Sequence, residues 1–243
     1  MKKFALLFIL NFCALSLWAQ GDSYNYGRFG IGINLSQNRP YADLKQANDG
    51  KSYNITGYYN LTPYIPLGLE LQAGDLSGGN IVTDQHKRQY KNNYMAIIAH
   101  GDFSLGEVID YDNNFFMHMI KDIYLGTGVG LISNKMTFIQ RTNLIPSVVY
   151  PVGTYTFPGK DKSMELMVPI RFGIDLKIYN SYSEPFMSVN IGYIHSITWG
   201  EGMDGYTDPA SGFKNNSPDQ YRQIVVGVKF NFGTSEPYTK SIN

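Results

Sequence analysis

Apolar and polar side chains alternate with a period of two along most of this chain. In residues 164–178 every second position from Met164 onward is apolar, whereas Glu165, Arg171 and Asp175 occupy the alternate positions. Successive side chains of a strand point to opposite faces of a sheet, and a helix would mix these two sets. The pattern therefore predicts a β-strand with one apolar and one polar face.

Eight segments have this character, and clusters of Gly, Pro, Asn, Asp and Ser separate them. The last strand has Val225 as the one exception to its alternation. The predicted strands cover residues 26–35, 51–61, 67–75, 93–105, 122–132, 164–178, 186–199 and 223–232.

The alternation alone does not decide which face looks inward. A soluble barrel lines its interior with the apolar face, whereas a membrane barrel turns that face to lipid. The membrane arrangement is favoured by predicted strands of roughly ten residues and by charged residues at only 16% of the chain. Aromatic residues also stand near the strand ends, at Tyr26, Tyr53, Tyr64, Tyr94 and Trp199.

A sheet in lipid must close on itself, because no water is present to satisfy its edges. We therefore expect an all-β fold, a closed eight-stranded antiparallel transmembrane β-barrel with long extracellular loops. The interior of so small a barrel is filled by side chains, and the 25 glycines leave room for the bulky ones.

Residues 1–20 have the layout of a secretory signal peptide, with Lys2 and Lys3 before an apolar stretch and cleavage expected after Ala19. We expect a signal peptide at 1–19, an outer-membrane barrel domain at 20–232 and a periplasmic tail at 233–243. The only cysteine, Cys13, lies in the signal, so the mature chain would have no thiol.

The charge balance gives no sign of a nucleic-acid partner. The whole chain has 20 basic and 20 acidic side chains, and loss of Lys2 and Lys3 with the signal leaves a slightly acidic protein. Nucleic-acid-binding domains are usually strongly basic, so we expect no nucleic acid among the partners.

Three short motifs resemble those of a known family. They are Tyr-Leu-Gly-Thr-Gly-Val-Gly at 124–130, Arg-Phe-Gly-Ile-Asp at 171–175 and Val-Gly-Val-Lys-Phe-Asn-Phe at 226–232. In these motifs, and along nearly the whole mature chain, the protein resembles the Bacteroidetes-type outer-membrane β-barrel proteins, whose architecture is like the OmpA transmembrane domain. The resemblance implies an outer-membrane location. Unlike OmpA, this protein is expected to have no peptidoglycan-binding domain after the barrel.

The resemblance also implies a signal for barrel assembly. Gly227, Phe230 and Phe232 match the Gly-x-x-aromatic-x-aromatic ending by which this class is recognised by the barrel-assembly machinery. Outer-membrane lipid and lipopolysaccharide are the other partners that the resemblance implies.

With an even number of strands, both termini lie on one side of the membrane, which we expect to be the periplasm. The outer connections are then residues 36–50, 76–92, 133–163 and 200–221, which are longer than the turns at 62–66 and 179–185. The segment 106–121 is an exceptionally long turn. It is either irregular or a short helix, in which Phe115, Phe116, Met117 and Met119 lie against the membrane surface or barrel mouth or engage a periplasmic partner.

Charged residues of the predicted inward faces form the first candidate site. Buried charges persist only when they are paired, so we expect Arg171 within salt-bridge distance of an inward carboxylate. The set is either an ion-paired plug or part of a conducting or proton-linked lumen. Its members are Arg28, Glu70, Asp102, Glu165, Arg171, Asp175, Lys177 and Lys229.

The third outer connection contains the second candidate site, an apolar segment that would bind a protein partner or ligand. The alternative is a hairpin that packs its own apolar side chains. The patch comprises Leu144, Ile145, Val148, Val149, Tyr150, Tyr155 and Phe157.

We expect no enzymatic activity, no cofactor and no metal site. His195 and Ser196 are adjacent in a predicted strand and point to opposite faces, so they are badly placed as a catalytic pair. We expect a non-enzymatic barrel with a structural or interaction role. A small pore or transporter and a barrel component of a secretion machinery remain the alternatives.

Overall fold

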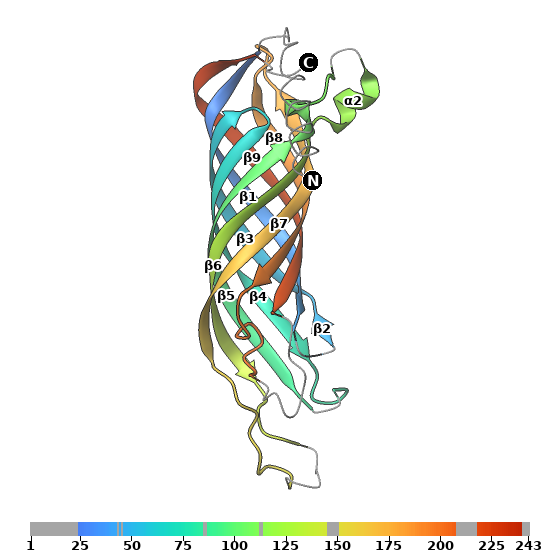
Figure 1. The fold of residues 1–243 in the computed structure, drawn as a ribbon, viewed down its shortest axis with the longest axis vertical. Coiled ribbons are helices and arrows are strands. Elements are labelled where there is room, and N and C mark those ends of the chain that lie inside the picture. The colour runs from blue at the N-terminus through green and yellow to red at the C-terminus, as the bar shows by residue number, and fades with distance from the viewer. Residues whose placement is uncertain are drawn as a thin grey trace, which may run out of the picture.

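The computed structural model describes residues 24–42, 44, 46–84, 87–111, 114–144, 151–207 and 218–239. The predicted signal at 1–19 lies outside these residues. Eight long strands and one two-residue strand dominate the fold (Figure 1). They are β1 (Tyr24–Tyr41), β2 (Ala47–Asn48), β3 (Gly50–Thr62), β4 (Ile65–Gly79), β5 (Gln89–Ser104), β6 (Ile123–Ile139), β7 (Lys162–Tyr179), β8 (Pro185–Thr198) and β9 (Gln220–Tyr238).

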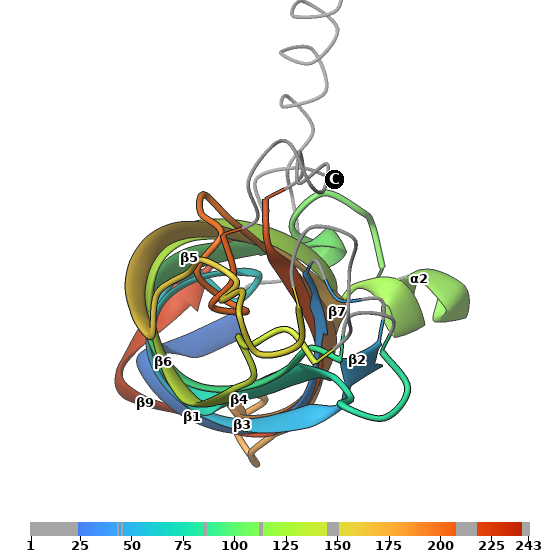
Figure 2. The same ribbon diagram turned by 90° about the horizontal axis from the view of Figure 1, so that it is seen from below.

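The eight long strands close into a ring, as Figure 2 shows along the axis. Each strand pairs antiparallel with its neighbour in the order β1, β3, β4, β5, β6, β7, β8 and β9, and β9 pairs with β1 to complete the ring. The short strand β2 is added to the end of β4. The eight-stranded antiparallel barrel expected from the alternation is confirmed.

The apolar faces of the strands form the outer wall of the barrel. On β7, for example, Leu166, Ile170 and Phe172 are exposed on the outside, whereas Met167 and Arg171 are buried in the interior. Among the described residues no helix is long and apolar enough to cross a membrane. An apolar wall around a polar interior is the arrangement of a membrane barrel and the reverse of a soluble one.

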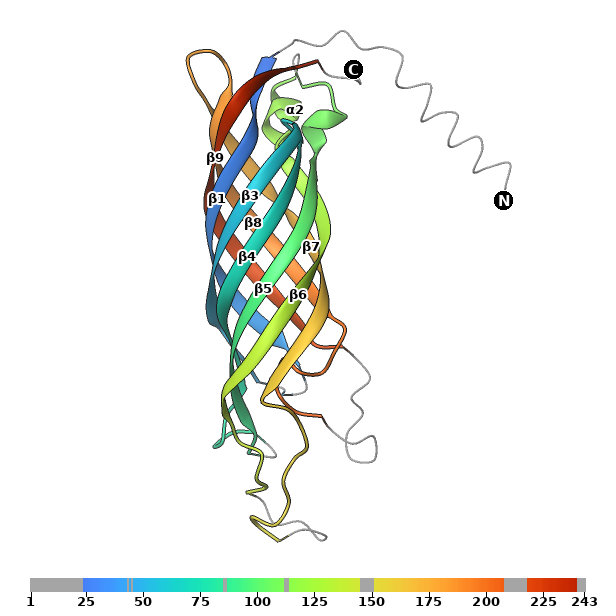
Figure 3. The same ribbon diagram turned by 90° about the vertical axis from the view of Figure 1, so that its left-hand side faces the viewer.

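The two ends of the barrel differ (Figure 3). At the terminal end, where β1 begins and β9 ends, the connections are residues 63–64, 105–122 and 180–184. At the opposite loop end they are residues 42–49, 80–88, 140–161 and 199–219. The long terminal-end connection contains a 3-10 helix, η2 (Leu105–Glu107), and a short helix, α2 (Phe115–Ile120). Of the two interpretations of this segment, the short helix is therefore the one observed.

Most of the strands extend further than the alternation predicted. At the loop end β1 continues to Tyr41 and β6 to Ile139. At the terminal end β9 continues to Tyr238, and its residues 235–238 pair with residues 24–27 of β1. The first six residues of the expected tail are therefore part of the barrel wall.

Candidate functional site

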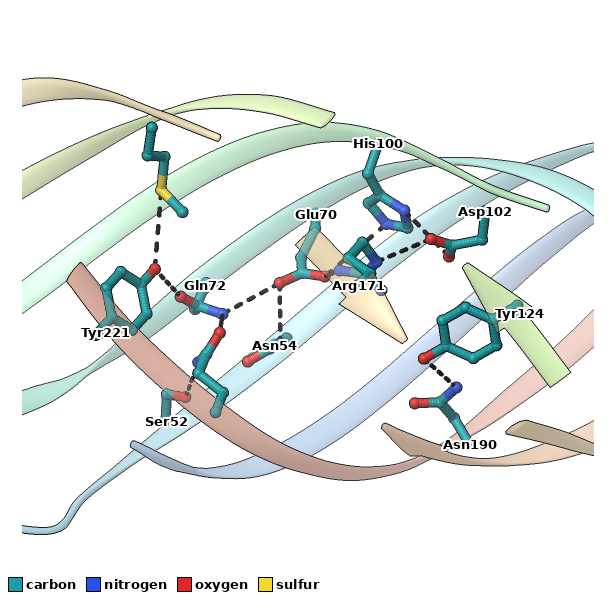
Figure 4. A network of polar contacts seen from close by, with 12 residues as sticks. Ser52, Asn54, Glu70, Gln72, His100, Asp102, Tyr124, Arg171, Asn190 and Tyr221 are labelled. Carbon is teal, nitrogen blue, oxygen red and sulfur yellow. Dashed lines mark hydrogen bonds and ion pairs between the residues drawn. The ribbon is translucent and has the colours of Figure 1, made fainter. Parts of the chain in front are cut away.

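An ion-paired cluster occupies the middle of the barrel interior (Figure 4). Arg171 of β7 donates from Nε to Asp102 of β5 over 3.0 Å and from Nη1 to Glu70 of β4 over 3.3 Å. All three side chains are buried. The prediction that Arg171 pairs with an inward carboxylate is confirmed, and the cluster joins three strands across the lumen.

Further polar side chains surround these charges. The carboxylate of Glu70 accepts hydrogen bonds from Asn54 over 2.9 Å and from Gln72 over 3.2 Å. His100 of β5 lies with Nδ1 3.3 Å from Asp102 and Nε2 3.9 Å from Glu70. A buried carboxylate is tolerated when its lone pairs are satisfied in this way.

The network continues toward the loop end through amide and hydroxyl groups. Gln72 donates to Gln223 over 3.2 Å and accepts from the hydroxyl of Tyr221 over 3.1 Å. Gln223 in turn donates to Asn38 and Ser52, both over 3.0 Å. These groups come from β1, β3, β4 and β9, so the interior is cross-linked by hydrogen bonds around the ring.

A second cluster lies nearer the terminal end. Lys177 donates to Asp122 over 2.6 Å, and Lys229 donates to Asn60 over 2.8 Å. Asp175 accepts from Asn190 over 2.8 Å. Together with Lys177 and Lys229 it borders a cavity of about 20 Å³, which has room for about one water molecule.

Arg28 and Glu165, predicted as members of the lumen network, are not joined to it. Arg28 lies at the terminal-end rim, where it pairs with Glu236 over 3.5 Å and is 39% exposed. Glu165 lies near the loop end and accepts a hydrogen bond from the backbone N–H of Gly202 over 2.7 Å. Strand parity gives the face on which a side chain lies but not its height along the barrel.

The segment 199–207 folds back into the loop end of the barrel and forms a cap over the lumen. Met203 is fully buried against interior side chains that include Tyr94, Ile132 and Tyr221. Its backbone N–H donates to Asp219 and its carbonyl accepts from Asn92. This segment was expected to be part of an external loop, and its burial is a feature that the sequence analysis missed.

Tyr206 fixes the other end of this cap. Its hydroxyl lies 2.7 Å from the carbonyl oxygen of Gln140 and 3.3 Å from that of Gln89. Burial of the ring raises the pKa of the Tyr206 hydroxyl, so it remains a neutral hydrogen-bond donor. The guanidinium of Arg88 lies 5.3 Å from the centre of the same ring.

The predicted loop patch is only partly supported as an exposed surface. Phe157 is 7% exposed and packs with Leu44, Tyr90 and Tyr206, and Tyr155 is half-buried against the same cluster. The hairpin alternative, in which the connection packs its own apolar side chains, describes these two residues better. Leu144 is exposed. Ile145, Val148, Val149 and Tyr150 lie outside the described residues.

The residues of the expected assembly signal lie on β9. Phe230 and Phe232 are exposed on the outer wall, whereas Gly227 is inward. A Cβ atom at Gly227 would collide with the side-chain oxygen of Asn34 on β1. The glycine is therefore required for close packing between β9 and β1, whatever its role in assembly.

His195 and Ser196 do not form a catalytic pair. The imidazole of His195 lies 2.8 Å from Gln220 and is stacked on Tyr193 on the outer face. Ser196 is fully buried on the inner face. The opposite orientation expected from the strand pattern is confirmed.

Several interior residues of these clusters were absent from the predicted set, among them His100, Gln72, Gln223 and Asp122. Each of them lies at an inward position of an observed strand or directly beside a strand. The alternation of inward and outward positions could therefore have identified them. The amides carry no formal charge, so the requirement that buried charges be paired did not point to them.

No family model matches the chain, and no curated protein matches it. Among solved structures, it is similar to Neisserial surface protein A, with 10% identity, coverage of 87% of this chain and 100% of that one, and a TM-score of 0.46. It is also similar to Ail of Yersinia pestis bound to the heparin analogue sucrose octasulfate, with 12% identity, coverage of 85% and 99%, and a TM-score of 0.43.

A third similar structure is the N-terminal β-barrel domain of Pseudomonas aeruginosa OprF, with 15% identity, coverage of 85% and 99%, and a TM-score of 0.36. These identities and scores are low, so they say nothing about what this chain binds. The Bacteroidetes-type resemblance of the short motifs stays a prediction.

Proposed function

We propose that this chain is an integral, non-enzymatic barrel protein of the bacterial outer membrane, with a structural or interaction role carried by its loop end. The observation that carries the proposal is the filled interior. Ion pairs and hydrogen bonds cross the lumen at Arg171, and the cap that contains Met203 and Tyr206 covers its loop end. The apolar outer wall suits contact with lipid, and the interior contacts hold the strands of the wall together.

The filled lumen disfavours the alternative of a small pore or transporter. A conducting path would have to pass the buried Arg171 cluster, where Glu70 and Asp102 are already engaged. Opening it would leave charges without partners, at a cost of several kcal/mol. No observation on the described residues favours the secretion-machinery alternative over a barrel that works alone.

Conductance in planar bilayers tests the proposal directly. The protein should insert into the bilayer and give no stable conductance steps, either as the natural sequence or as Arg171→Gln. In gel electrophoresis both should migrate as a heat-modifiable band, the sign of a folded barrel. Stable steps whose size changes in Arg171→Gln would overturn the proposal in favour of a pore lined by these charges.

The proposed orientation places both termini in the periplasm and the loop end outside the cell. Because the only natural cysteine is Cys13, single cysteines can be introduced for labelling. Val152 in the connection 140–161 and Tyr182 in the turn 180–184 are both well exposed. A membrane-impermeant maleimide should label Val152→Cys but not Tyr182→Cys on intact cells, and the reverse pattern would invert the orientation.

The partners implied by this proposal are outer-membrane lipid and lipopolysaccharide around the wall, the barrel-assembly machinery at β9 and an unknown protein at the loop end or at 106–121. For the last of these, α2 presents Phe115, Phe116 and Met119 on its exposed surface. Met117 instead packs against the buried cluster of Tyr26, Tyr64, Tyr111 and Tyr238 at the terminal end. The exposed apolar side chains make α2 a candidate contact surface at the terminal end.

A further inference from the structure

The outer wall of the barrel has a hollow toward its terminal end, on strands β1, β3, β4, β5, β6 and β9. Its volume is about 900 Å³, and its surface is almost wholly apolar. In the strand register Gly57 pairs with Leu69, and Leu69 with Ala99, so the hollow runs across neighbouring strands. Its lining includes Gly57, Tyr59, Leu67, Ala99, Gly101 and Val129.

The hollow exists because outward positions there carry small residues, and the packing of the barrel does not require them. A Cβ atom added at Gly57 would meet nothing within 4 Å. At Gly227, by contrast, the neighbouring strand leaves no room for one. In a membrane an unfilled space of this size would forfeit dispersion contacts on all its walls, so hydrocarbon from outside the protein must occupy it.

Charged groups stand at the edge of this hollow. The guanidinium carbon of Arg28 lies 5.8 Å from the centre of the Tyr59 ring, which lines the hollow. The ion pair of Arg28 with Glu236 spans 3.5 Å, and both side chains are about a third exposed, so donors of the guanidinium remain open to a further anion.

We infer that the hollow and the Arg28–Glu236 pair together bind one zwitterionic phospholipid of the leaflet at the terminal end. One acyl chain fills the hollow. The phosphate accepts hydrogen bonds from Arg28, whose planar donors suit phosphate, and the ammonium group of the head lies on Glu236. The inference rests on the membrane placement in the proposed function and adds a specific lipid site to it.

The head-group assignment follows from the charges at the rim. An anionic lipid such as phosphatidylglycerol would be attracted by Arg28 but repelled by Glu236. Phosphatidylethanolamine has a phosphate for Arg28 and an ammonium group for Glu236. A comparable cation at the loop end supplies the control, because Arg222 lies 5.8 Å from the centre of the Tyr41 ring and neither residue lines the hollow.

Native mass spectrometry on protein released from bilayers of equal phosphatidylethanolamine and phosphatidylglycerol tests the inference. The natural sequence should retain one phosphatidylethanolamine. Arg28→Gln should weaken its affinity by about tenfold or more, since it removes a hydrogen bond to a charged group. Glu236→Gln should shift the retained lipid toward phosphatidylglycerol.

Filling the hollow should abolish retention. Gly57→Leu puts a side chain into open space, so the barrel should still fold. The matched controls are Arg222→Gln at the loop end and Ala73→Leu, an outward position on β4 that does not line the hollow. Both controls should retain lipid as the natural sequence does.

Heat-modifiable migration, which reports whether the barrel has folded and inserted, separates failure of the inference from failure of the proposed function. If the natural sequence does not insert into bilayers, the proposed function fails. If it inserts but retains no phospholipid, or if the controls lose lipid as Gly57→Leu does, the lipid site alone is wrong. Retention of phosphatidylglycerol by the natural sequence would overturn the head-group assignment.

Discussion

Arg171 lies between two carboxylates, Glu70 and Asp102, that are both withdrawn from water. Its replacement by methionine keeps much of the volume but leaves those carboxylates without their cation. We expect Arg171→Met to lower the free energy of unfolding by about 3–5 kcal/mol, as for other broken buried ion pairs. Urea unfolding of the protein in lipid vesicles, followed by tryptophan fluorescence or heat-modifiable migration, measures the difference.

The control for this prediction is Arg222→Met, because Arg222 is half-buried and its ring contact is with exposed Tyr41. Arg222→Met should lower the free energy of unfolding by about 1 kcal/mol or less. Adding Glu70→Gln and Asp102→Asn to Arg171→Met should restore part of the lost stability. A loss no larger for Arg171→Met than for Arg222→Met would show that the cluster does not stabilise the barrel.

Two glycines provide a second test at the scale of single residues. A methyl group at Gly227 meets Asn34 and the backbone carbonyl of Ile33, whereas one at Gly57 meets open space. We expect Gly227→Ala to cost about 1–3 kcal/mol through overpacking and Gly57→Ala to be nearly neutral. Refolding yields and urea midpoints of both variants in the same vesicles measure these effects. Equal losses for Gly227→Ala and Gly57→Ala would contradict the prediction.

For single residues, the sequence determined the side of the wall but not the position along it. Arg171, Glu70 and Asp102 were placed together correctly because strict alternation assigns each to the inward face. Parity assigns Arg28 and Glu165 to the inward face as well, yet they lie at opposite ends of the barrel, and the guanidinium of Arg28 lies beside the exposed ring of Tyr59. Asp122, the partner of Lys177, lies in the predicted strand 122–132 at an inward alternate position, yet it was left out of the predicted set.

At the scale of elements, the cap 199–207 depends on contacts that bridge long distances in the sequence. Tyr206 contacts the carbonyl groups of Gln89 and Gln140. We expect Tyr206→Phe to weaken the attachment of the cap while leaving the barrel folded, since a buried hydrogen bond contributes about 1 kcal/mol. Hydrogen exchange at residues 199–207 should become faster, by about fivefold for that free energy.

The matched control is Tyr182→Phe, which removes a hydroxyl from a well-exposed ring in the turn 180–184. It should leave exchange in the cap unchanged. Equal exchange in Tyr206→Phe and the natural sequence would mean that the Tyr206 hydroxyl does not hold the cap in place.

The strands could be predicted from the sequence and the cap could not, for physical reasons. In the middle of each strand one face meets apolar surroundings, so the period of two is strong. Toward the loop end, residues such as Lys91 and Asn93 are outward and polar, which removes the contrast between faces and made the predicted strands too short. The cap has no period, because only its fit between distant strands buries Met203.

For the whole molecule, the decisive property is that the apolar face looks outward. Ile97 lies midway along β5 and is exposed on the outer wall. In a bilayer Ile97→Arg should cost about 2–4 kcal/mol, the usual penalty for a cation facing lipid near the midplane. The same unfolding measurement in vesicles gives this value. Val152→Arg, in the connection 140–161, should change it by about 0.5 kcal/mol or less. If Ile97→Arg were as neutral as Val152→Arg, the wall would face water and the barrel would not be a membrane protein.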